Sequence, residues 1–246
     1  TVYKITDQFN IFVNFSQGFS LQRFSELLTF PEEGFSISED VDDLQPQKVS
    51  NYELGVRGTW SSFEFTVSGF YNDSKFGVVS IDRGDGLFLP VRAPRRIYGV
   101  EATVDWQPFN KLSLGGTVSW QEGDVDVEDD GNYLAITSTE ISPLKVTAYV
   151  ESEFIKGWFN RLQLIVVGDR ERAFDDDIDS SPVESYTVVD LISSIQIGPG
   201  TFNIGIENIF DNFYFPVESQ VLGGTSNDNR RPGRGRTLSF NYRVSF

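Results

Sequence analysis

The amino-acid sequence predicts an all-β protein whose strands form an antiparallel β-barrel that spans a membrane. Three observations support this prediction. Apolar and polar residues alternate with a period of two from end to end, short and long connections alternate between these segments, and tryptophans gather beside the short connections. A period of two places successive side chains on opposite faces of a strand, and no segment shows the 3.6-residue period of a helix.

The expected strands are read from their apolar rows. The last segment is the clearest, with an apolar row at Leu238, Phe240, Tyr242, Val244 and Phe246. Comparable rows begin at Phe9, Tyr52, Phe63, Val100, Leu112, Val146, Leu162, Val189 and Phe202. Together with a strand fragment at residues 2–6, these rows predict about eleven strands.

The connections predict which way the barrel sits in its membrane. Short turns are expected near residues 7–8, 61–62, 108–111, 156–160 and 198–200. Long, polar, acidic stretches cover residues 20–48, 73–94, 123–140, 171–184 and 215–233. Short periplasmic turns and long extracellular loops are typical of outer-membrane barrels, whereas a soluble sandwich has no reason to keep its short turns at one end.

Two further features agree with a membrane barrel that has a wide lumen. Trp60, Trp106 and Trp158 lie beside short turns, where an aromatic girdle marks the membrane–water interface. Charged residues such as Glu53 and Arg57 alternate with the apolar rows and would be costly in a packed core. A water-filled lumen accepts them readily, which favours a large barrel over a small one filled by side chains.

Composition excludes several classes of function. The chain has 246 residues, a formal net charge of −16, and neither Cys nor His. These absences exclude disulfides, thiolate metal sites and catalysis that depends on histidine, and the negative charge disfavours nucleic acid as a partner. We therefore expect no enzyme activity, no cofactor and no nucleic-acid binding. The sequence contains no run of 18 apolar residues, so it predicts no transmembrane helix.

A calcium loop is the one metal site that the sequence suggests. Asp126, Glu128, Asp130 and Gly131 have the spacing of its first ligands, but Thr137 stands where the loop requires Glu. A second acidic cluster covers residues 175–179. Both clusters fall in expected outer loops, where solvated carboxylates are common, so the prediction is that the chain holds no metal.

The strand number indicates that the barrel is incomplete. Single-chain bacterial barrels generally have an even number of strands, and eleven is half of the roughly 22 strands of the plugged outer-membrane transporters. The chain also begins at Thr1 rather than Met. We expect a piece of a longer polypeptide.

Several motifs carry a resemblance to a known family. They are residues 15–19 (FSQGF), 44–46 (LQP), 50–57 (SNYELGVR), 98–101 (YGVE), 208–212 (NIFDN) followed by Tyr214, and 232–234 (PGR) before the last strand. In this order they resemble the TonB-dependent outer-membrane receptors of the ferric-siderophore type, although Gln47 stands where that family usually has Glu. The resemblance implies that residues 1–246 are the C-terminal half of the barrel domain, without the plug domain and the N-terminal strands.

The resemblance also implies a function and partners. Such receptors take up a scarce nutrient, most often a ferric siderophore, across the outer membrane of a Gram-negative bacterium, surrounded by the lipids of that membrane. The inner-membrane TonB–ExbB–ExbD complex supplies energy through an N-terminal region that this chain lacks. The terminal strand, with Leu238, Phe240, Tyr242, Val244 and Phe246, resembles the signal that the barrel-assembly machinery reads, and strand addition at a sheet edge is its physical basis.

Arginines at the bases of the expected loops are the candidate ligand-binding residues. They comprise Arg92, Arg95, Arg96, Arg170, Arg172, Arg230, Arg231 and Arg234, with the nearby aromatics Tyr98, Phe174 and Tyr214. Guanidinium groups draw an anionic ligand inward, and aromatic rings pack against its apolar parts. The alternative is that these arginines pair with neighbouring acids or with lipid phosphates.

Three other functions remain open at this stage. A passive porin, or a small self-contained barrel, predicts a native polypeptide of about this length without a plug. A membrane-barrel enzyme is disfavoured because such enzymes generally rely on His. A soluble all-β binding module predicts solubility without detergent, which the apolar rows and the terminal Phe246 oppose.

Overall fold

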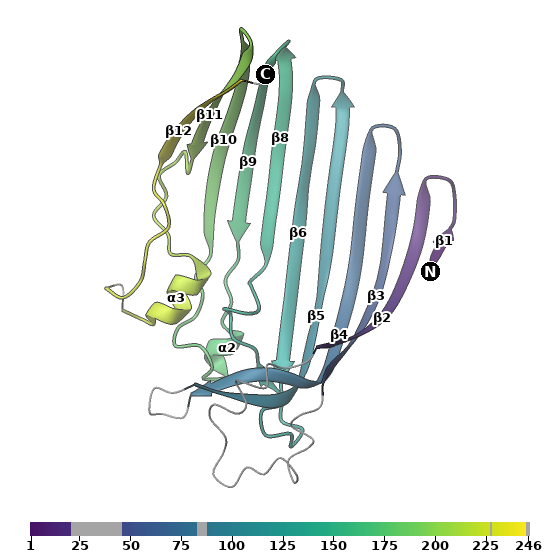
Figure 1. Cartoon of the computed structure of the whole chain (residues 1–246), viewed down its shortest axis with the longest axis vertical. Coiled ribbons are helices and arrows are strands. Elements are labelled where there is room, and N and C mark those ends of the chain that lie inside the picture. Colours follow the sequence, from purple (N-terminus) through teal and green to yellow (C-terminus); the bar gives the residue numbers. More distant parts are fainter. Residues whose placement is uncertain (21–45, 83–87, 227, 245–246) are drawn as a thin grey trace.

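The computed structural model describes residues 1–20, 46–82, 88–226 and 228–244, and shows one curved antiparallel sheet (Figure 1). Its strands are β1 (Val2–Lys4), β2 (Phe9–Ser20), β3 (Gln47–Thr59), β4 (Phe63–Asp82), β5 (Phe88–Phe109), β6 (Leu112–Val125), β7 (Leu134–Ala135), β8 (Lys145–Ile155), β9 (Trp158–Val167), β10 (Tyr186–Ile197), β11 (Gly200–Glu207) and β12 (Thr237–Val244). Among the described residues, two short helices, α2 (Arg172–Asp175) and α3 (Val217–Gly223), lie in the connections.

Strand order follows the chain. Each strand pairs with the next from β1 to β6 and from β8 to β12, with β6 beside β8, while the two-residue β7 pairs with β6. This path contains the eleven strands that the apolar rows predict. Among the described residues β1 and β12 form the two edges of the sheet and are not paired with each other, so the barrel is partial.

Connections of two lengths lie at opposite ends of the sheet (Figure 1). The short turns that join β2 to β1, β3 to β4, β5 to β6, β8 to β9 and β10 to β11 all lie at the upper end. The described long connections, after β6, β9 and β11 and including α2 and α3, lie at the lower end. The predicted alternation is therefore confirmed for the short turns and for the long connections after β6, β9 and β11, whereas most of the predicted loop at residues 20–48 lies outside the described residues. In the described part of the chain, neither helix is long and apolar enough to cross a membrane.

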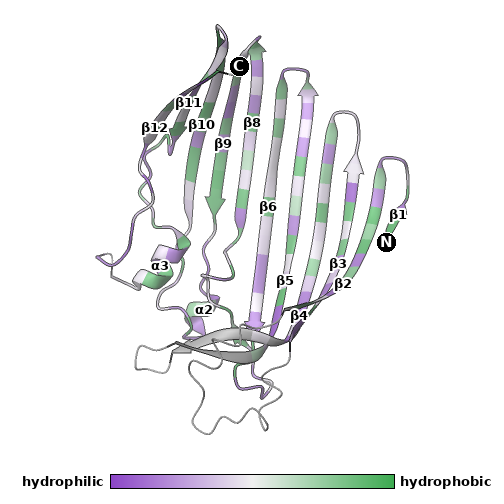
Figure 2. Cartoon of the chain, in the orientation of Figure 1, coloured by the Kyte–Doolittle hydropathy of each residue, from purple (hydrophilic) through white to green (hydrophobic). Residues whose placement is uncertain are grey.

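Strand register aligns the apolar rows into one continuous face. Leu238 pairs with Ile206, Ile206 with Leu191, Leu191 with Leu162, and Leu162 with Val150. Figure 2 shows the resulting alternation of apolar and polar bands along the strands. Many large side chains on this face are exposed in the isolated chain, including Leu54 at 59% and Phe240 at 64%. We call it the apolar face; such a continuous surface is typical of contact with lipid.

Two regions differ from the sequence prediction. Residues 73–94 were expected to form a loop, but β4 and β5 run through most of this range as paired strands of 20 and 22 residues. The pairing shifts register between Ser74 and Gly77, which marks a β-bulge. A strand that does not face lipid needs no row of apolar residues. The alternation of apolar and polar residues is therefore lost in this region, although the backbones of the two strands remain paired.

The helices α2 and α3 are the second difference, because no helical period was found. They have only four and seven residues, which is too short for a period to emerge from sequence. Within the described residues, the largest buried apolar cluster comprises Ala93, Val125, Ile136 and Ile141. It lies where the segment after β7 covers the outer ends of β5 and β6. Among the described residues, this cluster of buried apolar side chains therefore lies at the loop end of the sheet.

Candidate functional site

The face opposite the apolar rows is a wall of polar side chains. Arg161 on β9 forms an ion pair with Glu151 on β8 at 2.8 Å, and its guanidinium lies 4.2 Å from the centre of the Tyr149 ring. The Tyr149 hydroxyl donates a hydrogen bond to Asp105 on β5. Thr117 and Thr147 share another hydrogen bond at 2.7 Å. These contacts across strands satisfy polar groups that a dry interior would penalise, which agrees with a water-filled lumen.

Two outer loops are joined to each other above this wall. They are loop 126–144, between β6 and β8, and loop 168–185, between β9 and β10. Arg170 from the second loop binds Glu122 through Nε at 3.2 Å and through Nη2 at 2.9 Å. The same guanidinium donates to the Ser138 hydroxyl at 2.7 Å and to the Ile136 carbonyl at 2.9 Å. Only 5% of Arg170 is exposed.

Acidic residues of loop 168–185 bind the backbone of loop 126–144. The Asp176 carboxylate accepts a hydrogen bond from the Ala135 amide at 2.7 Å. Asp179 accepts from the Ser138 amide at 3.0 Å and from the Thr137 hydroxyl at 2.6 Å. The acidic cluster at residues 175–179 therefore fastens the two loops together.

Asp126 has a comparable role within its own loop. Its carboxylate accepts hydrogen bonds from the amides of Asp130 at 3.1 Å and of Gly131 at 2.7 Å, and the residue is 2% exposed. In this arrangement Asp126 closes the turn that the sequence presents as a calcium loop. The described residues contain no group of three or more acidic side chains arranged to hold a metal ion.

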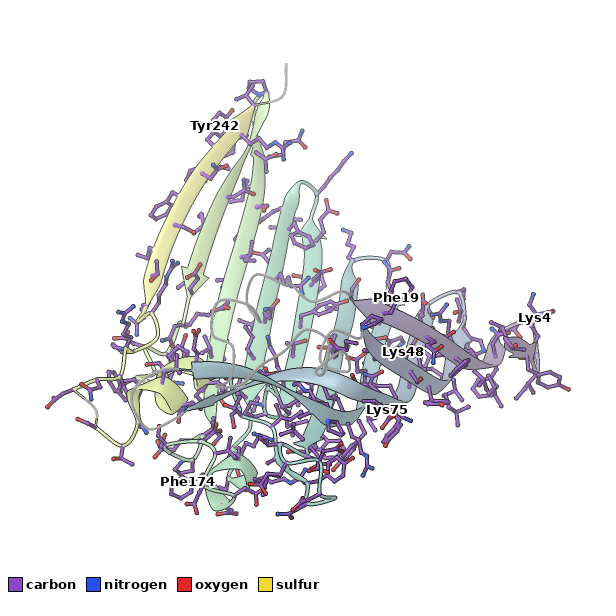
Figure 3. The ribbon with its side chains drawn as sticks, turned by 60° about the horizontal axis from the view of Figure 1, so that its bottom comes forward. Lys4, Phe19, Lys48, Lys75, Phe174 and Tyr242 are labelled. Carbon is purple, nitrogen blue, oxygen red and sulfur yellow. The ribbon has the colours of Figure 1, made fainter. Side chains whose placement is uncertain are left out.

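Arg172, the first residue of α2, is held by acids on β6. It contacts Asp124 closely, and lies 3.5 Å from Glu122 and 3.4 Å from the Tyr98 hydroxyl. Burial alone lowers the pKa of Arg172, but the charge of Asp124 and the hydrogen bond to it outweigh this effect and leave the pKa raised. The guanidinium therefore stays charged and paired. Phe174 on the same helix is 41% exposed at the loop end (Figure 3).

The arginines of β5 point to alternating faces. Arg95 forms an ion pair with Glu140 at 2.6 Å, which ties loop 126–144 to β5. Arg96 lies 3.9 Å from Asp73 and 3.9 Å from the centre of the Tyr133 ring. The register places Arg96 and Tyr98 on the apolar face, in line with Val100. The side chain of Arg92 lies outside the described residues.

Tyr186 and Tyr214 stack with their ring centres 4.5 Å apart and separate two recesses at the outer end of the polar face. The first recess has a volume of about 420 Å³ and is lined by both tyrosines, Phe215 and Arg230. The second, of about 530 Å³, is bordered by both tyrosines and by the charged residues Lys145, Asp190, Glu207 and Arg234. The structure thus brings Tyr214, Arg230 and Arg234 of the predicted set close together.

Arg230 combines a structural contact with its place in the first recess. Its Nε donates to the Gly224 carbonyl at 2.7 Å, its Nη2 donates to the Ser181 hydroxyl at 3.2 Å, and it lies 5.6 Å from the centre of the Phe215 ring. These contacts fix the guanidinium beside the Tyr186–Tyr214 pair. Arg231, its neighbour, is exposed, and its amide binds the Ser219 hydroxyl.

Sequence reasoning missed residues that only the strand register brings together. Tyr186 is not part of any recognisable motif. Lys145 is the first residue of β8, and nothing in the sequence around it indicates that it borders a recess. Glu122 and Ser138 hold Arg170 from positions 48 and 32 residues away. No spacing in the sequence signals such long-range partners.

The terminal strand β12 pairs along its length with β11, and Leu238, Phe240 and Tyr242 lie on the apolar face. Tyr242 is visible along this strand in Figure 3. Val244 ends the strand opposite Gly200. Phe246, the last residue of the predicted assembly signal, lies outside the described residues.

A half-open antiparallel barrel with a polar lumen wall, short turns at one rim and long loops at the other is the architecture typical of outer-membrane β-barrels. Comparison with known proteins makes the assignment specific. The family described as TonB dependent receptor-like, beta-barrel, matches residues 1–209, so the chain belongs to that family. The resemblance found in the motifs is thereby confirmed, and the family consists of transporters and receptors rather than enzymes.

The curated relatives that match the chain include receptors for ferric aerobactin and for rhizobactin. The chain is 30% identical over 260 residues to the ferric aerobactin receptor of Klebsiella pneumoniae, covering 98% of this chain and 34% of the relative. It is 25% identical over 256 residues to the rhizobactin receptor of Rhizobium meliloti (strain 1021), covering 96% of this chain and 33% of the relative. The chain therefore spans about a third of the length of these relatives, which fits a C-terminal half of the barrel.

Solved structures show the same fold. The copper transporter OprC superposes with a TM-score of 0.81 at 17% identity, over 100% of this chain and 38% of that chain. The unliganded ferric citrate transporter FecA superposes with a TM-score of 0.73 at 18% identity, over 100% and 37% respectively.

Proposed function

We propose that this chain is part of an outer-membrane active transporter for a ferric siderophore, and that the TonB–ExbB–ExbD complex energises it. The observation that carries the proposal is the 30% identity to a ferric aerobactin receptor over 98% of the chain. The polar lumen wall and the outer recesses support it. Residues 1–246 would supply the C-terminal half of the barrel, and the plug, the N-terminal strands and the contact with TonB would lie elsewhere in the full polypeptide.

The ligand would approach from the loop end. We place its contacts at the two recesses around Tyr186 and Tyr214, because aromatic walls and cations converge there. Arg230 and Lys145 would attract the anionic complex, and the stacked tyrosines would pack against its apolar parts. Arg95, Arg170 and Arg172 would act indirectly, since their charges are engaged with Glu140, Glu122 and Asp124.

The proposal also includes the membrane location of the barrel and its insertion into that membrane. The chain would lie in the outer membrane of a Gram-negative bacterium, with its apolar face against lipid. The strand β12 would present its apolar row to the barrel-assembly machinery through its free edge.

A binding experiment tests the proposed ligand site. The full-length receptor, purified in detergent, is titrated with ⁵⁵Fe-labelled ferric aerobactin and with the iron-free compound. We expect saturable binding of the ferric form, weakened about tenfold by Lys145→Gln, because a charge-assisted contact contributes about 1.5–3 kcal/mol. Lys111→Gln, which removes the same charge near the short turns, is the matched control and should bind normally. Failure of the full-length receptor to bind any ferric siderophore would contradict the proposed function.

A further inference from the structure

Two sequence motifs, NIFDN with the tyrosine that follows it and PGR, lie against each other at the loop end of the sheet. The Gly233 amide donates a hydrogen bond to the Tyr214 carbonyl at 2.8 Å. The side chain of Asn208 donates through Nδ2 to the Arg234 carbonyl at 3.0 Å. In Figure 1 these two segments run together between the sheet and α3. The segment that leads into β12 therefore holds the segment that follows β11.

Asn208 fixes the point where the second of these segments begins. Only 2% of the residue is exposed, and its φ of 51° lies in the left-handed region, which asparagine adopts more readily than most residues. Its amide donates to the Asp190 carboxylate on β10 at 2.8 Å, and its side-chain oxygen accepts from the Asn212 amide at 2.9 Å. The turn is thus closed by its own side chain and attached to the sheet, just before Tyr214.

Gly233 provides the surface on which the Tyr214 ring lies. A Cβ at residue 233 would overlap the atoms of this ring, so any side chain there would displace the ring or the backbone. Gly233 does not have the left-handed backbone conformation that often requires glycine. Glycine is therefore needed at this position for the space it leaves to the ring.

The Tyr214 ring is a wall that the two outer recesses share. It stacks on Tyr186 with ring centres 4.5 Å apart and ring planes inclined by 22°. The recess of about 420 Å³ borders this ring together with Arg230, and the recess of about 530 Å³ borders it together with Lys145 and Gly233 itself. Because an aromatic ring is rigid, displacing it changes the shape of both recesses at once.

We propose that Gly233 is a positioning residue for ligand recognition. By leaving room for the Tyr214 ring against the backbone, it sets the shape of the two recesses that receive the ferric siderophore. The PGR motif thus acts on ligand affinity through a tyrosine that another motif supplies. The inference rests on the proposed function, because that function assigns the ligand to these recesses.

Ligand binding by the full-length receptor tests this role. The receptor, purified in detergent, is titrated with ⁵⁵Fe-labelled ferric aerobactin. We expect Gly233→Ala to raise Kd about tenfold with an unchanged number of binding sites, because a displaced ring fits the ligand less well. The matched control is Gly69→Ala. A Cβ at residue 69 would have only the Gly99 carbonyl within 4 Å, at 3.7 Å, so this variant should bind normally.

The number of sites separates positioning from a loss of structure. A partly misfolded Gly233→Ala receptor would show fewer binding sites with the Kd of the wild type. That result, or an equal Kd for Gly233→Ala and Gly69→Ala, would overturn the proposal. A heat-dependent shift in electrophoretic mobility confirms that each variant is folded.

A double-mutant cycle tests whether Gly233 acts through the ring. Tyr214→Ala removes the ring that a Cβ at residue 233 would overlap. We expect Gly233→Ala to lower the urea midpoint of unfolding when Tyr214 is present, and to leave the midpoint unchanged in the Tyr214→Ala background. An equal shift in both backgrounds would show that Gly233 acts independently of the ring and would contradict the inference.

Failure of the inference can be distinguished from failure of the proposed function. If the wild-type receptor bound no ferric siderophore, the proposed function would be wrong and the inference would fall with it. If the wild type bound ferric aerobactin and Gly233→Ala bound it equally well, only the inference would be wrong.

Discussion

Arg170 and Glu122 form a two-bonded ion pair, with Nε–Oε1 and Nη2–Oε2 distances of 3.2 Å and 2.9 Å, that joins the outer end of β6 to the loop after β9. Exposure of the two side chains is 3% and 14%. Because Arg170 also binds Ser138 and the Ile136 carbonyl, one buried guanidinium holds three segments of the chain. Loops 126–144 and 168–185 therefore form a single structural unit.

Replacing Arg170 should release this unit. Arg170→Gln leaves the largely buried Glu122 with only its longer contact to Arg172, at 3.5 Å. Breaking a buried ion pair costs about 3–5 kcal/mol. We expect amide hydrogen exchange across residues 134–144 of the full-length receptor to become about 100-fold faster, measured by mass spectrometry. Arg231→Gln, at an exposed position, is the control. Unchanged exchange in the Arg170 variant would show that other contacts hold the loops.

In the lumen wall, the lack of a side chain at Gly115 leaves room for the ring of Tyr149. Gly115 pairs with Tyr149 across β6 and β8, and a Cβ at residue 115 would overlap the tyrosine ring. Gly115→Ala should therefore displace Tyr149 from Asp105 and Arg161 and destabilise the barrel by about 1–3 kcal/mol, measured by urea unfolding in detergent. Gly69→Ala faces open space and should be close to neutral. Equal stability of both variants would contradict the packing described for Tyr149.

Aromatic residues border the apolar face at both ends, with Trp106 beside the short turns and Trp120 packed on Tyr98 toward the loops, and they predict defined depths in a bilayer. In single-tryptophan variants of the full-length receptor, Trp106 and Trp120 should be quenched best by lipids brominated near the headgroup. Leu164→Trp, placed midway on the apolar face, should be quenched best by lipids brominated near the chain end. Tryptophans that no brominated lipid quenches would show that the apolar face does not contact lipid.

Strand number and turn placement could be predicted from sequence because the physics behind them is local. A lipid-facing row must be apolar at every second residue, so segments such as 238–244 reveal both the strand and its outer face. The same reasoning failed at residues 73–94, where β4 and β5 stay paired beyond the end of the apolar face. Without a lipid-facing row, nothing there requires apolar and polar residues to alternate.

The candidate site was less accessible to sequence reasoning because register creates it. Tyr52, Tyr71 and Tyr98 form a row only when three strands are aligned, and Tyr186 meets Tyr214 across 28 residues of chain. The arginines were found as a class from their place near loops. Which of them pair with acids, as Arg170 and Arg172 do, depends on contacts about 50 residues apart.

Energy-dependent uptake of a ferric siderophore would distinguish an active transporter from a passive channel. Cells that express the full-length receptor are given ⁵⁵Fe-labelled ferric aerobactin, with and without a protonophore that collapses the inner-membrane potential. We expect saturable accumulation of iron that the protonophore abolishes, because an energised inner-membrane complex must drive transport through the barrel. Uptake that rises in proportion to ligand concentration and persists with the protonophore would contradict it and indicate a passive channel.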